Sequence, residues 1–265
     1  MDFAGPGTPL NSDDVDANAT LIQVGLPELW SVISVETSGC GFLPDRRPKI
    51  LFERHFFHRL TGGKFDAEDP DVSAPNAGGY GPSGAHQYDR LAAAIQLDRH
   101  AALQSASWGL GQIMGSNFQA AGYNDVEHMV ADMVASEANQ LRAMANFIKA
   151  NGMDDPLRAH DWASVARRYN GPNYAANNYD GQLAHFFQLY AGGSATDFRV
   201  RAAQIYLFFL GYDTGGIDGK SGPATARAVT SFQKSAGLAE TGVVDDALLN
   251  ALANTQPQSA QDITT

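Results

Sequence analysis

The sequence predicts a mainly α-helical protein built from two domains of unequal size. Apolar residues recur at helical spacing along most of the chain, and a run of small residues, AGGSAT at 191–196, separates two such regions. We expect this run to be a flexible linker. The predicted segments are an N-terminal extension (1–25), a large domain (26–190), the linker (191–196), a small domain (197–252) and a disordered tail (253–265).

The large domain has four segments with a helical apolar pattern. The third has the clearest stripe, and the fourth starts at Asp161, a residue type that caps helix N-termini. No strand is clear, although a short hairpin fits within 42–65 or the glycine-rich loops. The predicted helices span residues 26–35, 90–103, 126–149 and 161–169.

The small domain is expected to fold as three short helices joined by a repeated turn. The first helix covers 198–210, the second opens at Gly222-Pro223, and the third runs from a cap at Asp245 to Leu252. The two turn-plus-helix units resemble each other, which indicates an internal duplication. We expect the two domains to fold separately, because each has its own apolar pattern. The expected small-domain core is Ile205, Leu207, Leu210, Val229, Phe232, Leu238, Val244 and Leu248.

Composition excludes several classes of function. The chain has 265 residues and a formal net charge of −11, which argues against general binding to nucleic acid and to anionic membrane surfaces. No apolar run approaches the ~20 residues of a membrane helix, and the first ten residues show no secretory signal. We therefore expect synthesis in the cytoplasm. A single cysteine, Cys40, rules out an intrachain disulfide and is expected to be a buried thiol.

Three segments combine residues suited to glycan chemistry. Glu36 stands where an apolar helix runs out, so burial can keep its carboxyl protonated, as a general acid requires. In SASWGLGQIM, at 105–114, glycines let the backbone approach a ligand, and Ser107, Trp108 and Gln112 are candidate sugar contacts. In RYNGPNY, at 168–174, we select Tyr169, Asn170 and Tyr174 for the same role.

Taken together, VETSGCGF, SASWGLGQIM and RYNGPNY resemble the ordered motifs of the lysozyme superfamily, and most closely the N-acetylmuramidase domain of phage endolysins. The segments RRPKILFERHFF, YDRLAAAIQLDR and SEANQLRAMANFI extend the resemblance over residues 26–190. It implies a lysozyme-like helical fold, cleavage of the β-1,4 bond between N-acetylmuramic acid and N-acetylglucosamine, and Glu36 as the catalytic acid.

The small domain resembles the type 1 peptidoglycan-binding domain over residues 200–244. This resemblance implies a module that holds the cell wall. The motif positions that we carry over as wall-binding candidates are Asp218, Gly219, Thr225 and Gln233.

A second catalytic carboxylate is harder to select. Glu53, flanked by phenylalanines and expected to lie beside Arg54 or His55, is the first candidate, and a structural ion pair is an equal alternative. Asp45 lies beside two arginines, so we expect a salt bridge there. Glu137 interrupts an apolar stripe and should be hydrogen-bonded inside the domain, because a buried carboxylate needs a partner.

The histidines do not predict a metal site. His55 and His58 are three residues apart and His86 lies near Asp89, but no glutamate stands inside a histidine pair at metal spacing. We therefore expect no metal ligands and no cofactor.

The sequence thus predicts a monomeric endolysin that acts on bacterial peptidoglycan and is released by a holin-type pore. A lytic transglycosylase, which leaves 1,6-anhydro ends, is the nearest alternative. A zinc amidase or endopeptidase and a non-catalytic wall-binding protein are alternatives from other classes.

Overall fold

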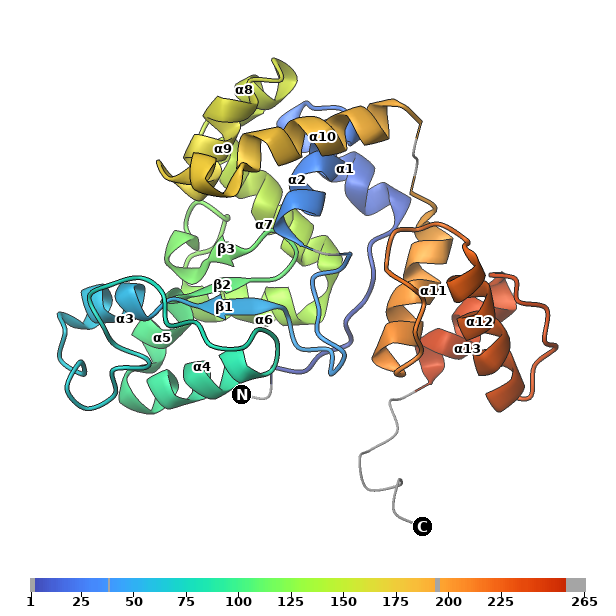
Figure 1. Cartoon of the computed structure of the whole chain (residues 1–265), viewed down its shortest axis with the longest axis horizontal. Helices are drawn as coiled ribbons and strands as arrows, with labels where there is room; N and C mark the ends of the chain where they lie inside the picture. The colour runs from blue at the N-terminus through green and yellow to red at the C-terminus, as the bar shows by residue number, and fades with distance from the viewer. Residues whose placement is uncertain (1–2, 38, 194–195, 256–265) are drawn as a thin grey trace, which may run out of the picture.

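The computed structural model describes residues 3–37, 39–193 and 196–255. Figure 1 shows a larger body of helices around a small sheet, with a three-helix body beside it. The fold is mainly α-helical, as predicted. Most of the predicted tail and two linker residues, 194 and 195, lie outside the described residues.

The elements of the larger body are α1 (Ser12–Ile22), α2 (Leu26–Glu36), β1 (Ile50–Phe52), α3 (Arg54–Thr61), α4 (His86–Leu97), α5 (Arg99–Gln104), β2 (Ala106–Trp108), β3 (Ile113–Met114), η1 (Gly115–Asn117), α6 (Val126–Ala135), α7 (Glu137–Ala150), α8 (Asp154–Arg158), α9 (Trp162–Asn170), η2 (Tyr174–Asn177) and α10 (Tyr179–Ala191). The smaller body consists of α11 (Phe198–Phe209), α12 (Pro223–Ser235) and α13 (Asp246–Asn254).

The small sheet joins two motifs that are distant in sequence. Its strand order is β1-β2-β3 and both pairings are antiparallel, with Leu51 opposite Ser107 and Ser107 opposite Met114. The strands have two or three residues each, and β2 is buried throughout. Strands this short and this buried show no alternation of polar and apolar residues, so the pattern could not reveal them.

Two predicted helices are each divided by a capping residue. Asp98 takes an extended conformation, and its side chain accepts a hydrogen bond from Ala101 N at the start of α5. Ser136 is likewise extended between α6 and α7 and caps α7 by accepting from Asn139 N. A bridge between Thr8 and Ser136 fixes this second break. Both interruptions turn the chain while the apolar pattern continues, which is why the sequence indicated single helices.

The N-terminal segment belongs to the core of the larger body. Helix α1 packs against α7, and Val15 and Ile22 are fully buried in the same apolar cluster as Trp108. The ring of Phe3 lies 5.7 Å from that of Trp108. Residues 3–22 therefore brace the large domain.

The smaller body has the predicted three helices, with Asp245 capping α13 through a hydrogen bond from Leu248 N. Leu207, Val229, Phe232 and Leu248 form its core as predicted. Ile205 does not join them: it packs with Phe209 of its own domain against Cys40 and Phe42 of the larger body.

The two bodies are also joined by a buried ion pair. The guanidinium of Arg201 in α11 donates to both carboxylate oxygens of Glu137 in α7, at 2.6 and 2.8 Å. The side chains of both residues are at most 1% exposed. Because α11 completes a charge pair and an apolar cluster of the larger body, these contacts favour two domains that stabilise each other over two that fold separately.

Candidate active site

Glu36 is the last residue of α2. Thr37 ends the helix in an extended conformation, and its hydroxyl donates to Ile33 O at 3.1 Å. The Glu36 side chain is half-buried, and burial raises its pKa from 4.5 to about 8. The carboxyl group is therefore mostly protonated at neutral pH, the state that a general acid needs.

The RYNGPNY segment lies against Glu36. The side chain of Asn170, the last residue of α9, hydrogen-bonds to Glu36 and lowers its pKa, an effect smaller than the rise caused by burial. Burial, reinforced by the negative charge of Glu36, raises the pKa of Tyr169, so its hydroxyl stays a donor. That hydroxyl donates to Gly111 O at 2.6 Å, which brings the SASWGLGQIM segment to the same place.

Tyr179 is a neighbour of Glu36 that the sequence did not reveal. It begins α10, and its pKa is raised by burial and by the charge of Glu36. The helix α10 packs along α2, which places this tyrosine beside the end of α2. No local pattern distinguishes Tyr179 from the other tyrosines of the segment.

Ser107 and Gln112 shape the loop between β2 and β3. The Ser107 hydroxyl donates to Gln112 Oε1 at 2.9 Å, and Gln112 Nε2 donates to Gly109 O at 2.8 Å. Gln112 has a φ of 46°, in the left-handed region, and these bonds stabilise that conformation. Both side chains thereby hold the loop so that Gly111 O can accept a hydrogen bond from the Tyr169 hydroxyl.

Trp108 does not offer a face to a sugar. Its side chain is 0% exposed, and its indole N–H donates to Leu103 O at 3.1 Å. The expectation of sugar stacking at this position is corrected: Trp108 is a core residue on which Phe3 packs. Tyr174, in η2, remains partly exposed, with the Arg167 guanidinium 5.9 Å from the centre of its ring.

Glu53 lies where β1 meets α3. Its Oε1 accepts a hydrogen bond from Tyr80 at 3.3 Å, and its Oε2 lies 3.1 Å from His55 Nδ1. Glu53 Oε2 and His55 Nδ1 are both buried and take part in no hydrogen bond among the described residues. The structure thus places Glu53 in contact with His55, one of its two expected neighbours, in a geometry that leaves both facing atoms without a hydrogen bond. This is compatible with either role predicted for Glu53.

The remaining predicted carboxylates have structural partners. Asp45 forms a salt bridge to Arg47 at 2.6 Å, as predicted. Glu137 accepts from the backbone N–H of Leu10 and Gly41, as expected of a group bonded inside the domain, and also from Arg201 across the interface.

The motif residues of the small domain organise its two turns. Gln204 Oε1 accepts from the backbone N–H of Asp218 and Gly219, while its Nε2 donates to Asp218 Oδ1 and Thr225 Oγ1. Gln233 repeats this at the second turn, accepting from Gly242 N at 2.9 Å and donating to Thr241 at 2.9 Å. This repeated bonding supports the internal duplication.

The same bonds revise the wall-binding candidates. Thr225 and Gln233 are 2% and 3% exposed, so their side chains hold the turns and do not reach the surface. Gly219 is buried as well. Of the four candidates, only Asp218 has an exposed side chain.

Within the described residues, no group of three or more histidine, cysteine or carboxylate side chains is arranged to hold a metal ion. In that same part of the chain, no helix is both long and apolar enough to cross a membrane.

Comparison with known proteins identifies the families of both domains. The profile of the N-acetylmuramidase family matches residues 25–191, and that of a peptidoglycan binding domain matches residues 197–252. A solved structure, the Burkholderia AP3 phage endolysin, is 41% identical with a TM-score of 0.65. The alignment covers 71% of this chain and 73% of that one. No curated protein matches the chain significantly.

A helical N-acetylmuramidase domain followed by a peptidoglycan binding domain defines a peptidoglycan glycosidase. The chain belongs to the N-acetylmuramidase family.

Proposed function

We propose that this protein is a phage-type endolysin that hydrolyses the β-1,4 bond between N-acetylmuramic acid and N-acetylglucosamine. The observation that carries the proposal is the half-buried Glu36, with a pKa of about 8 and Asn170 beside it. The family of the chain and its likeness to a phage endolysin support the choice of bond and biological role.

In the proposed mechanism, Glu36 donates its proton to the glycosidic oxygen as the bond to the muramic acid carbon breaks. Positive charge develops on that sugar ring, and water adds to the carbon with loss of a proton. The departing chain keeps the proton from Glu36 as a new hydroxyl group. Asn170, Tyr169 and the partly exposed Tyr174 position the sugars, while Ser107 and Gln112 hold the loop beneath Tyr169.

Glu53 is the proposed second carboxylate, which would take up the proton of the attacking water. The contact of its Oε2 with His55 Nδ1, at 3.1 Å, supports this assignment, because it holds the carboxylate in one orientation.

Release through a holin-type pore and a monomeric state complete the proposal. The holin-type pore follows from the proposed role of a phage-type endolysin, which the likeness to the AP3 phage endolysin supports. Release through the pore is tested by expressing the protein in a bacterial host with and without such a pore and following the turbidity of the culture.

The reaction is tested by digesting purified peptidoglycan and analysing the products by mass spectrometry, with and without EDTA. We expect fragments with reducing N-acetylmuramic acid ends, in equal yield under both conditions. Mainly 1,6-anhydro ends would show a lytic transglycosylase instead, and free peptides would contradict glycan cleavage altogether.

A further inference from the structure

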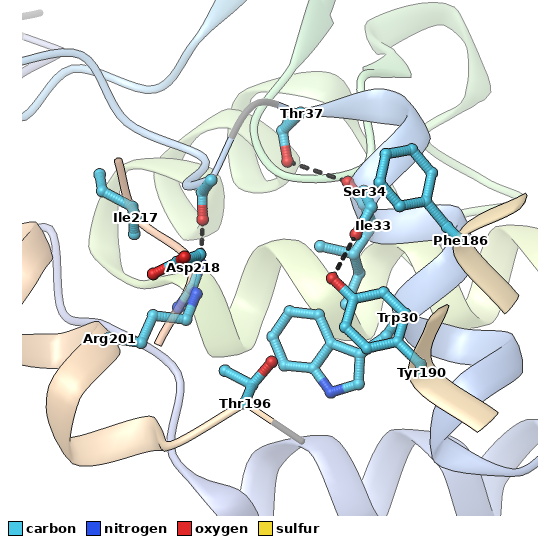
Figure 2. A pocket seen from close by; sticks show the side chains of 11 residues that line it. Trp30, Ile33, Ser34, Thr37, Phe186, Tyr190, Thr196, Arg201, Ile217 and Asp218 are labelled. Carbon is cyan, nitrogen blue, oxygen red and sulfur yellow. Dashed lines mark hydrogen bonds between the residues drawn. The ribbon is translucent and has the colours of Figure 1, made fainter. Parts of the chain in front are cut away.

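A cavity of about 230 Å³ lies between the two bodies, beside the helix that ends at Glu36. Figure 2 shows Arg201, Ile217 and Asp218 of the small domain on one side, with Trp30, Phe186 and Tyr190 of the large domain across from them. The other lining residues are Ile33, Ser34, Thr37, Gly39 and Thr196.

The cavity shares two helices with the candidate active site. Ser34 lines it two residues before Glu36 on α2, and its hydroxyl lies 2.8 Å from that of Tyr190 on α10. Tyr179, at the other end of α10, neighbours Glu36. The cavity and Glu36 therefore lie along the same pair of packed helices, α2 and α10.

The charge of the cavity is negative. Arg201 is neutralised by Glu137, and a further N–H of its Nη2 donates to Gly39 O at 2.8 Å. Asp218 is exposed and takes part in none of the ion pairs found in the described part of the chain. Its hydrogen bonds there, from Gln204 Nε2 and Lys220 N, both use Oδ1. A cation is therefore the favoured partner of this carboxylate.

The size and the apolar walls restrict the occupant further. Sites for whole small-molecule ligands measure roughly 300–1,000 Å³, so a cavity of about 230 Å³ admits one side chain and not several sugar rings. Trp30, Ile33, Phe186 and Ile217 would cover an aliphatic stem, leaving its charged end at Asp218.

From this charge and shape, we infer that the cavity binds the side chain of the diamino acid in the peptidoglycan stem peptide, with its terminal ammonium at Asp218. This inference rests on the proposed function, because it takes the substrate to be peptidoglycan. It assigns a site for the peptide to an enzyme that cuts the glycan, and both domains contribute to that site.

The test compares native walls with walls whose free amino groups have been N-acetylated, using the full-length protein. The variants are Asp218→Asn and, as a matched control, Asp213→Asn. Asp213 is an exposed carboxylate of the same turn that also accepts a backbone N–H, from Gly215, but it does not line the cavity. For each protein, kcat/KM is measured on both substrates from the release of reducing ends.

For the wild type and Asp213→Asn, we expect native walls to be cut about two- to fivefold more efficiently than acetylated walls, the range of a partly exposed ion pair. In Asp218→Asn this ratio should fall to about one. Glycan strands stripped of peptides should behave like acetylated walls.

A wild-type ratio of one, or an unchanged ratio in Asp218→Asn, would overturn the inference while leaving glycan cleavage intact. Should Asp218→Asn fail to fold, the wild type on native, acetylated and stripped substrates still decides. A wild type that releases no reducing ends from any substrate would instead contradict the proposed function.

Discussion

Glu137 and Arg201 form a buried bidentate ion pair that connects the catalytic and wall-binding domains. Burial opposes ionisation of Glu137, but Arg201 and the backbone N–H groups of Gly41 and Leu10 outweigh it, so the pKa of Glu137 lies below its ordinary value. The stabilising effect of the ionised Glu137 is therefore complete well above pH 4.5. It is lost at more acidic pH, as the Glu137 carboxylate of the folded protein takes up a proton.

Breaking this pair from either side should destabilise the protein. We expect Glu137→Gln and Arg201→Met each to lower the free energy of unfolding by roughly 3–5 kcal/mol, because each leaves a buried polar group unpaired. The double variant should cost clearly less than the sum, measured by chemical denaturation as a double-mutant cycle. Arg199→Met is the control, since Arg199 pairs with Asp246 at the surface. It should cost ~0–1 kcal/mol. Additive effects of the two buried substitutions would refute the coupling.

Removal of the small domain should weaken the large one. A chain ending at Ala191 retains every residue of the candidate active site but loses Arg201, Ile205 and Phe209, which cover Glu137, Cys40 and Phe42. We expect a lower melting temperature than that of the full chain, because Cys40 and Phe42 lose their apolar cover and Glu137 loses its cation. Calorimetry of both chains measures this. Equal melting temperatures would restore the expectation of independent domains.

Glu53→Gln separates the two roles of this carboxylate. If Glu53 is the second catalytic group, the Glu53→Gln variant should lose activity by roughly 10²-fold or more, while its melting temperature changes little. The matched control is Tyr80→Phe, which removes the hydrogen bond to Oε1 and keeps the carboxylate. If Glu53→Gln instead melts at a lower temperature and retains its activity per folded molecule, the ion pair with His55 is structural.

The pH dependence should reflect the raised pKa of Glu36. The acid must be protonated, so kcat/KM should fall as the pH rises through about 8. Folding is affected in the same direction: the folded state holds this proton more tightly, so stability decreases between pH 4.5 and about 8. Glu36→Gln should therefore melt above the wild type at pH 9, and the difference should narrow by pH 5. A difference independent of pH would contradict the raised pKa.

The sequence revealed those features that depend on local patterns. Asp161 and Asp245 cap their helices as predicted, and the three motifs at Glu36, Gly111 and Asn170 come together. The order of the motifs alone did not show which contact joins them, namely the hydrogen bond from the Tyr169 hydroxyl to Gly111 O.

Features that depend on distant contacts were missed or misread. Trp108 looked like a ligand surface because glycines surround it, but Phe3, more than a hundred residues away, packs on it. Glu137 is tolerated in an apolar stripe because Arg201 and the backbone N–H groups of Leu10 and Gly41, all distant in sequence, bond to it. Tyr179 reaches the site because α10 packs on α2, and no local spacing encodes that packing.

The most direct test of Glu36 as the catalytic acid is the rate at which Glu36→Gln releases reducing ends from purified peptidoglycan at pH 6, relative to the wild type. Glutamine keeps the size and polarity of the side chain but has no proton to donate. We expect a loss of about 10²–10⁴-fold in a protein that remains folded. A folded Glu36→Gln protein that cuts the wall at nearly the wild-type rate would contradict the mechanism.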